Sequence, residues 1–195
     1  MMKTNKLYGV GYGINDIYVD GKRSRCFQVW KEMLRRCYSE SFHEKYPTYI
    51  GCEVCVEWHD FRVFREWYEE NYYEIEGQRM DLDKDILVKG NKIYSPSTCV
   101  FVPQVINVLF TKRNSKRGQY PIGVSFDKKN NKYQANCHVR GKAKKLGRYR
   151  TVEQAFSVYK QAKEEEIKRI ADEYIELIPS NLYQAMYNYE VSILD

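Results

Sequence analysis

The chain has 195 residues and a formal net charge of +6, which is enough for one domain or two small ones. It contains no apolar run of about 18 residues and no signal-peptide core, so we expect a cytoplasmic protein with no membrane partner. Six cysteines without a secretory signal indicate reduced thiols rather than a disulfide framework.

Residues 7–20 (LYGVGYGINDIYVD) have the composition of an extended or hairpin segment, with Asp20-Gly21 as a turn. Gly9, Gly11 and Gly13 alternate in it, but no Gly-Lys-Ser/Thr and no helix follow them. We therefore interpret this segment as a glycine-loosened strand and not as a phosphate-binding loop.

Two amphipathic helices are predicted next, over residues 27–38 and from Val56 to about Asn71. The apolar stripe of the first contains Phe27, Trp30, Met33, Leu34 and Cys37, and that of the second contains Trp58, Phe61, Phe64, Trp67 and Tyr68. Such stripes are typical of core packing, so we do not expect them to stack on bases.

Between these helices, Cys52 and Cys55 form a single C-x-x-C pair, which is half of a structural zinc site. Cys37 and Cys99 could complete the four ligands, but neither has a second cysteine at short spacing. A zinc site and a set of buried free thiols therefore both remain open, and the thiols are favoured.

The segment 80–110 is predicted to form a hairpin that turns at Gly90-Asn91, followed by a loop over residues 95–98 and a short helix that starts at Pro103. This ββα order resembles the core of HNH endonucleases. It also resembles the degenerate HNH-like segment that precedes an AP2-type domain in many bacteriophage proteins, over roughly residues 27–174. The resemblance implies catalytic positions at Asp83, Lys84, Asp85, Asn91 and Asn107, around Mg²⁺ or Mn²⁺ if the protein is a nuclease.

Lys84 occupies the position at which the HNH family has the histidine that deprotonates water. A lysine has an ordinary pKa of about 10.4 and would need strong desolvation to act as a base. Loss of catalysis, a nuclease or nickase with altered chemistry, and an accidental resemblance are the three interpretations, in that order.

Three short runs with period-2 alternation follow between Tyr120 and Tyr149, and they predict a three-stranded antiparallel sheet. Thr151 and Gln154 form a capping box that starts a long helix, whose apolar stripe would cover one face of this sheet. Residues 111–150 contain 13 Lys or Arg and one acidic residue, a net charge of +12. A cationic sheet face suits a phosphate backbone, although a solvated surface is the simpler alternative.

This second segment resembles the AP2 (ERF-type) DNA-binding domain through Gly123-Val124, Lys132-Tyr133, Leu146-Gly147 and the Thr-x-Glu-x-Ala start of its helix. The resemblance implies that the sheet docks in the major groove through Ser125, Asp127, Asn136, His138 and Lys145. The Arg and Trp contacts of the plant family are missing at Ser125 and Lys145. The expected DNA-binding surface also includes the cations Lys128, Lys129, Lys132, Arg140, Lys142, Lys144, Arg148 and Arg150.

Together these features predict an α+β protein with an HNH-like domain (residues 1–112), an AP2-like domain (113–178) and a tail (179–195) that packs on the core. We expect a phage-type protein that binds double-stranded DNA in the host cytoplasm and lacks standard HNH catalysis. The alternatives are a metal-dependent homing or nicking endonuclease and a phage effector that binds a host protein. RNA is a weaker candidate, because the sheet lacks an RNP-type aromatic signature.

Overall fold

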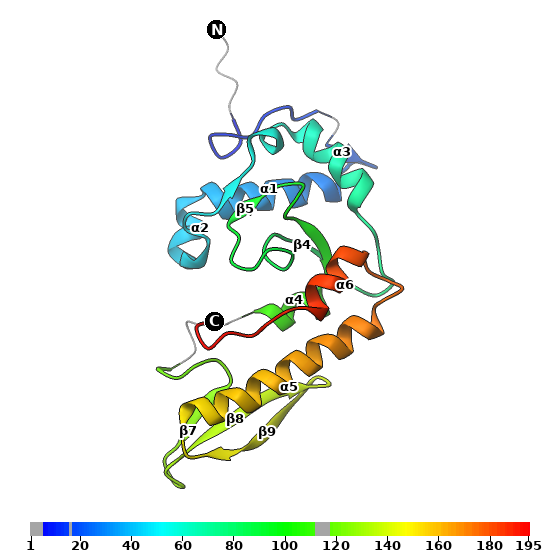
Figure 1. Ribbon diagram of the computed structural model, residues 1–195. Coiled ribbons are helices and arrows are strands. Elements are labelled where there is room, and N and C mark those ends of the chain that lie inside the picture. Colours follow the sequence, from blue (N-terminus) through cyan, green and yellow to red (C-terminus); the bar gives the residue numbers. More distant parts are fainter. Residues whose placement is uncertain (1–5, 16, 112–117) are drawn as a thin grey trace. The chain divides into compact units, whose positions relative to one another are not determined.

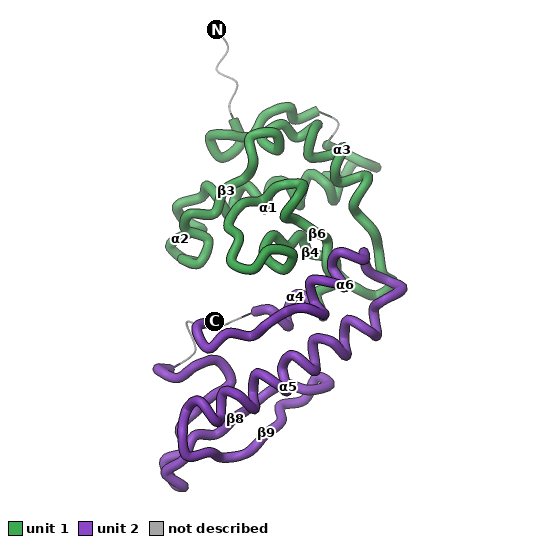
Figure 2. Tube along the Cα trace, viewed as in Figure 1, with its two compact units in different colours: residues 1–104 green, residues 105–195 purple. Residues whose placement is uncertain are grey.

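The computed structural model describes residues 6–15, 17–111 and 118–195 and has a mixed α+β architecture (Figure 1). The chain divides into two compact units, residues 1–104 and 105–195 (Figure 2). The domain boundary predicted between residues 112 and 113 lies outside the described residues. Helix α4 (Gln104–Asn107) spans the junction of the units, and the tail from residue 179 belongs to the second unit.

The first unit is built around α1 (Arg25–Tyr38), which begins where the Ser24 hydroxyl accepts a hydrogen bond from the Phe27 N–H at 3.2 Å. The stripe predicted for this helix is confirmed, because its five apolar residues are all buried. Short helical segments, α2 (Glu40–Lys45) and η1 (Pro47–Tyr49), follow it.

The second predicted helix is interrupted at Asp60, which corrects the expectation of one helix from Val56. A 3-10 turn, η2 (Val56–His59), precedes α3 (Phe61–Asn71). Asp60 has extended backbone angles and its carboxylate accepts from the Arg62 N–H at 3.0 Å, so it caps α3 and cannot continue a helix from Val56. Trp58 is nevertheless fully buried, and its carbonyl accepts from the Trp30 indole N–H at 2.7 Å.

Strands in the first unit are short. The Asp20-Gly21 turn is confirmed, with both residues at positive φ between β1 (Tyr18–Val19) and β2 (Lys22–Arg23). The hairpin predicted to close at Gly90-Asn91 is wrong. Instead β4 (Met80–Asp83) pairs antiparallel with the fully buried β6 (Val100–Pro103), and β5 (Ile93–Tyr94) pairs parallel with β3 (Glu53–Val54). Strand β6 is a continuous run of buried apolar residues, so β4 buries more apolar surface by pairing with β6 than it would by pairing with β5.

The second unit contains the predicted three-stranded antiparallel sheet, in the order β7 (Val124–Asp127), β8 (Lys132–Val139) and β9 (Lys142–Tyr149). Helix α5 (Val152–Glu173) lies along one face of this sheet (Figure 1). The Thr151 hydroxyl caps the helix by accepting from the Gln154 N–H at 3.2 Å, as the capping box predicts. Val124, Ala135 and Cys137 pack against apolar residues of α5 in the core.

Gly123, immediately before β7, allows the closest approach between sheet and helix. Its φ is +78°, and a Cβ at this position would lie 2.0 Å from the Tyr159 ring. Any side chain here would therefore push α5 away from the sheet.

The tail from residue 179 packs within the second unit. Helix α5 ends at Glu173. Helix α6 (Ser180–Tyr187) then buries Leu182 and Met186, and Val191 joins the core under the sheet.

A 3-10 turn, η3 (Val108–Phe110), follows α4. Within the described ranges, no helix is both long and apolar enough to cross a membrane.

Candidate nucleic-acid interface

The strand register of the second unit defines two faces of its sheet. Residues directly opposite each other in an antiparallel pair share a face. Ala135 and Cys137 are buried against α5, so their neighbours Gln134, Asn136 and His138 lie on the other face, which we call the open face.

Four uncharged polar side chains form the centre of the open face. Ser125 lies opposite Gln134, and Asn136 donates from Nδ2 to the Ser125 hydroxyl at 3.1 Å. His138 continues the same row along β8 and is exposed. Gln134 is absent from the predicted DNA-contacting residues, although the alternation that places Lys132 and Asn136 on one face also places Gln134 there.

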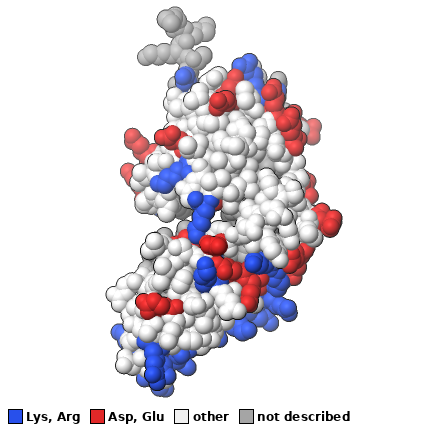
Figure 3. Space-filling model, viewed as in Figure 1, with Lys and Arg blue, Asp and Glu red and all other residues white. Residues whose placement is uncertain are grey.

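Three exposed cations flank this row on the open face. Lys132 lies opposite Asp127, Lys145 opposite Asn136, and Arg148 opposite Gln134. Lys132 lies at the start of β8, and Lys145 and Arg148 lie on β9. The open face thus combines hydrogen-bonding groups with positive charge. In the view of Figure 3, which has α5 in front of the sheet, Lys and Arg lie along the margins of the second unit.

Asp127 orients one of these cations. Its carboxylate accepts from Asn130 Nδ2 at 2.9 Å and from Arg148 Nε at 2.6 Å. Together these two hydrogen bonds lower the pKa of Asp127 to about 2, and the one from Asn130 has the larger effect. Asp127 therefore positions Arg148 from the edge of the open face. The sequence, by contrast, predicts that Asp127 contacts DNA directly.

The remaining predicted cations divide among other surfaces, which corrects the expectation that all of them converge on one face. Lys142 lies opposite Val139 and Lys144 opposite Cys137, so both belong to the side that α5 covers, at the exposed edge of the sheet. Lys128 and Lys129 lie in the β7–β8 turn, Arg140 in the β8–β9 turn, and Arg150 just before α5. Four further basic residues, 112, 113, 116 and 117, lie outside the described residues.

A β-bulge in β9 keeps Lys145 and Arg148 on the same face. Gly147 lies opposite Ala135 and Lys145 opposite Asn136, which leaves Leu146 without a partner in the ladder. Leu146 packs into the core beneath the sheet. The extra residue is therefore absorbed without turning either cation over.

The β8–β9 turn is anchored to α5 by a buried carboxylate. Arg140 and Gly141 both have positive φ, and the Arg140 N–H donates to Glu166 Oε1 at 2.7 Å. Arg169 donates two hydrogen bonds to the same carboxylate, at 2.7 and 2.8 Å, and lowers the pKa of Glu166. The turn at the end of the sheet is thus fixed by the helix behind it.

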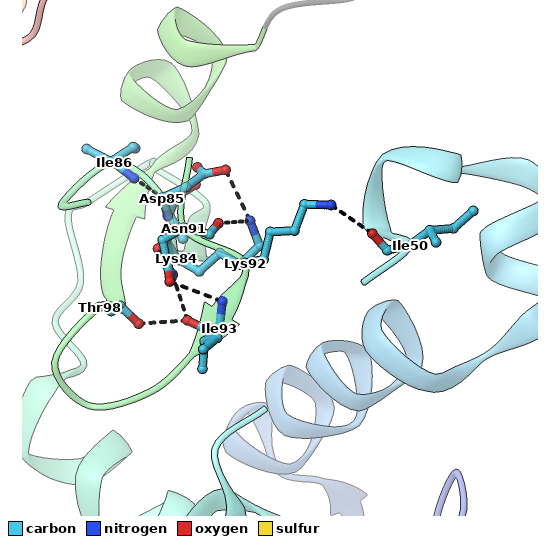
Figure 4. Close-up of polar contacts among 9 residues, drawn as sticks. Ile50, Lys84, Asp85, Ile86, Asn91, Lys92, Ile93 and Thr98 are labelled. Atoms are coloured by element: carbon cyan, nitrogen blue, oxygen red, sulfur yellow. Dashed lines mark hydrogen bonds and ion pairs between the residues drawn. The ribbon is translucent and has the colours of Figure 1, made fainter. Parts of the chain in front are cut away.

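Three of the HNH-like positions, Lys84, Asp85 and Asn91, lie in the loop of residues 84–99 (Figure 4). Asp83 ends β4 immediately before this loop. Lys84 is 9% exposed, and its Nζ donates to Asp85 Oδ2 at 3.1 Å and to the Asn91 carbonyl at 3.0 Å. Asn91 in turn donates from Nδ2 to the carbonyls of Lys84 and Ile93, each at 2.7 Å. These contacts close the loop around the ammonium group.

Burial opposes the charge on Lys84, but Asp85, together with Cys52 and Asp83, offsets that effect and raises the pKa of Lys84 above its ordinary value. Lys84 is therefore charged at neutral pH and has no lone pair with which to accept a proton from water. A lysine in this setting supports the loop.

Asp83 caps the first turn of the same loop. Its Oδ1 accepts from the N–H groups of Asp85 and Ile86, both at 2.8 Å. Burial, and secondarily the Asp85 carboxylate, raises the pKa of Asp83 to about 6. This carboxylate is thus committed to the backbone of the loop.

These residues do not fit a catalytic magnesium or manganese site. A divalent ion at Asp83 and Asp85 would have to displace the Lys84 ammonium from Asp85. In the part of the chain that the structure describes, no three His, Cys, Asp or Glu side chains are grouped to hold a metal ion. The fifth predicted position, Asn107, belongs to α4 in the second unit.

The four cysteines considered as zinc ligands are free thiols. Cys37, Cys52 and Cys99 are buried, and Cys55 is half-buried. Burial raises the pKa of Cys37 to about 12 and that of Cys55 to about 11. The structure does not gather them into a four-ligand site.

Comparison of the chain with known protein families, curated proteins and solved structures finds no match.

Proposed function

We propose that the second unit binds double-stranded DNA through the open face of its sheet. The observation that carries this proposal is the arrangement on that face: an uncharged row of Ser125, Gln134, Asn136 and His138, flanked by exposed Lys132, Lys145 and Arg148. Cations at the margins suit phosphates, whereas amide, hydroxyl and imidazole groups suit base edges.

The proposal agrees with the resemblance of this unit to AP2-type domains, in which the sheet docks in the major groove. Helix α5 and the buried Glu166 support the sheet from behind, so the open face is held rigid without being covered by that helix. A rigid face loses little conformational entropy on binding.

For the first unit, we propose an HNH-like domain that has lost HNH catalysis. Support comes from Lys84, which is charged and hydrogen-bonded within its loop, and from Asp83, which holds backbone N–H groups. The whole chain would then be a phage-type DNA-binding protein and not a homing endonuclease.

A pair of double variants tests the DNA-binding proposal. Lys132→Gln/Lys145→Gln removes two charges from the open face, and Lys142→Gln/Lys144→Gln removes the same two charges from the side that α5 covers. Each lost phosphate contact should reduce the slope of log K against log salt by about 0.9. We expect the open-face variant to lose about two such contacts and the control to retain most of its affinity for a 20-base-pair duplex. Equal losses in both variants would overturn the assignment of the face.

A nicking assay tests the loss of catalysis. Supercoiled plasmid is incubated with stoichiometric protein and Mg²⁺ or Mn²⁺, with Asp83→Ala/Asp85→Ala as the matched control. We expect no difference between the two proteins. Nicking by the unmodified protein that the variant abolishes would establish the endonuclease alternative.

A further inference from the structure

A cleft in the first unit lies between α1 and β4, and none of its lining residues belongs to the loop of residues 84–99. Its volume is about 220 Å³, and three arginines, Arg25, Arg36 and Arg79, line it together with Glu32 and Asp81. This volume is below the roughly 300–1,000 Å³ of pockets for drug-sized molecules. The cleft therefore suits a small charged group.

The two acidic residues of the cleft already have arginine partners. Glu32 accepts from Arg35 at 3.1 and 2.6 Å, and Asp81 accepts from Arg79 at 3.1 Å through both oxygens. Arg25 donates to the Met80 carbonyl at 2.9 Å, which carries no formal charge. Two guanidinium charges, those of Arg25 and Arg36, thus lack a paired carboxylate within 4.0 Å in the described part of the chain.

Arg36 is the less usual of the two because it is only partly accessible to water. Its guanidinium lies 5.8 Å from the centre of the Tyr49 ring and shares a hydrogen bond with the Tyr94 phenol. The Glu32 carboxylate also favours its charge, but Glu32 is hydrogen-bonded to Arg35. Charged groups withdrawn from water in proteins are normally paired with an opposite charge. A neutral phenol does not supply one.

We infer that this cleft binds a phosphate group, held by Arg25 and Arg36, with Arg79 at its edge. The guanidinium fork donates parallel hydrogen bonds to phosphate oxygens. The oxygens of a phosphate are arranged tetrahedrally, so two guanidinium groups can donate to different oxygens, which suits a phosphate better than a planar carboxylate with two oxygens. The group is either the phosphodiester of a nucleic acid or a free phosphate, and this inference does not depend on whether the sheet binds DNA.

Isothermal titration of the full-length protein with orthophosphate, at ionic strength held constant with sodium chloride, tests the site. We expect saturable binding of one phosphate, about tenfold weaker in Arg25→Gln and in Arg36→Met, because each variant loses a charge-assisted hydrogen bond. Arg25 is exposed, so its variant remains informative if Arg36→Met fails to fold. Arg65→Gln, on α3 outside the cleft, is the matched control and should bind normally.

Two results would overturn the inference: no saturable phosphate binding, or equal weakening in the Arg65→Gln control. Acetate binding as tight as phosphate would overturn the assignment of the ligand class.

A second titration, with a short DNA duplex, identifies the source of the phosphate. If the source is a phosphodiester, Arg25→Gln lowers the salt slope of duplex binding by about 0.9. If it is a free phosphate, duplex binding is unchanged while orthophosphate binding falls. The open-face variants do not alter the cleft, so failure of the DNA-binding proposal and failure of this inference give different results.

Discussion

The loop of residues 84–99 in the first unit and the open face of the second unit both place lysine beside aspartate and asparagine, but they use the charge differently. In the loop, the Lys84 ammonium is 9% exposed and donates to Asp85 and to the Asn91 carbonyl. On the sheet, Lys132 and Lys145 are exposed, and the single aspartate orients Arg148. Positive charge alone therefore does not identify a binding surface, and the partners of each cation must be known.

The two units also differ in how their cores are filled. All three tryptophans of the chain (residues 30, 58 and 67) belong to the first unit, where they pack with Phe61, Phe64 and Phe101. The second unit has a thinner core between one sheet and α5. Tryptophan fluorescence therefore reports the first unit alone, and the two units can be followed separately.

Gly123→Ala should give the largest effect and should separate the units most clearly. The new Cβ would lie 2.0 Å from the Tyr159 ring at a positive φ, so both overpacking and backbone strain oppose it. We expect the second unit to lose about 3 kcal/mol or more of stability. Denaturant titration followed by circular dichroism should show the loss, while the tryptophan transition stays in place.

Gly141→Ala is the matched control for that substitution. Its φ is +72°, but a Cβ there meets no atom within 4 Å, so only the backbone term of about 1 kcal/mol remains. If the two substitutions cost the same, the close contact with Tyr159 contributes nothing.

Lys84→Met should destabilise the first unit by about 2 kcal/mol. The substitution keeps the apolar stem but removes the ammonium that Asp85 and the Asn91 carbonyl accept from. The cost stays below the 3–5 kcal/mol of a fully buried pair, because Asp85 is 47% exposed. Tryptophan fluorescence in a urea titration measures it, with Lys22→Met on the exposed β2 strand as the control. An unchanged midpoint for Lys84→Met would show that the ammonium does not hold the loop.

Asp83→Asn should change how the stability of the first unit depends on pH. The pKa of Asp83 is about 6 in the fold, against an ordinary value of 3.8, so the folded state binds this proton more tightly. Its contribution is therefore fully present below about pH 4 and is lost as the pH rises to about 6. The stability of the unmodified protein relative to the variant should fall by up to about 3 kcal/mol across that interval.

Asparagine retains the oxygen that accepts from the N–H groups of Asp85 and Ile86, so the loop geometry is preserved. The urea midpoints of both proteins are compared at several pH values. Parallel curves would show that Asp83 does not titrate abnormally.

Arg148→Gln should give the smallest effect, a loss of about tenfold in affinity for duplex DNA, with a salt slope lower by about 0.9. The reason is the loss of one cation from the open face, next to Gln134. Fluorescence anisotropy at several salt concentrations measures both quantities. Lys144→Gln removes the same charge from the other side of the sheet and should change them less, and the reverse order would contradict the assigned faces.

Much of the fold can be predicted from hydrophobic periodicity, because long elements repeat their pattern. The stripe of α1, the three strands between Val124 and Tyr149, and the start of α5 at Thr151 are examples. The pairing of β3 with β5 could not be predicted, because each strand has two residues and is too short to show a hydrophobic alternation. The break at Asp60 requires knowing that its side chain caps α3 and does not extend into solvent.

The candidate site was less accessible to sequence reasoning. Alternation predicts which residues of β8 share a face, but the faces of β9 depend on a bulge that no turn signal marks. Alternation alone already separates Lys142 and Lys144 from Lys145, whereas the bulge decides that Arg148 shares the face of Lys145. The pairing of Asp127 with Arg148 joins residues 21 positions apart and follows only from the register.

Because of the bulge at Leu146, strand β9 could lose one residue without exchanging the side chains on its two faces. In a regular strand, loss of one residue would exchange the side chains of its two faces. Here Leu146 has no partner in the ladder, so its deletion would restore regular pairing and leave Lys145 and Arg148 where they are. A shortened β9 should thus keep its electrostatic footprint and lose only one apolar contact beneath the sheet.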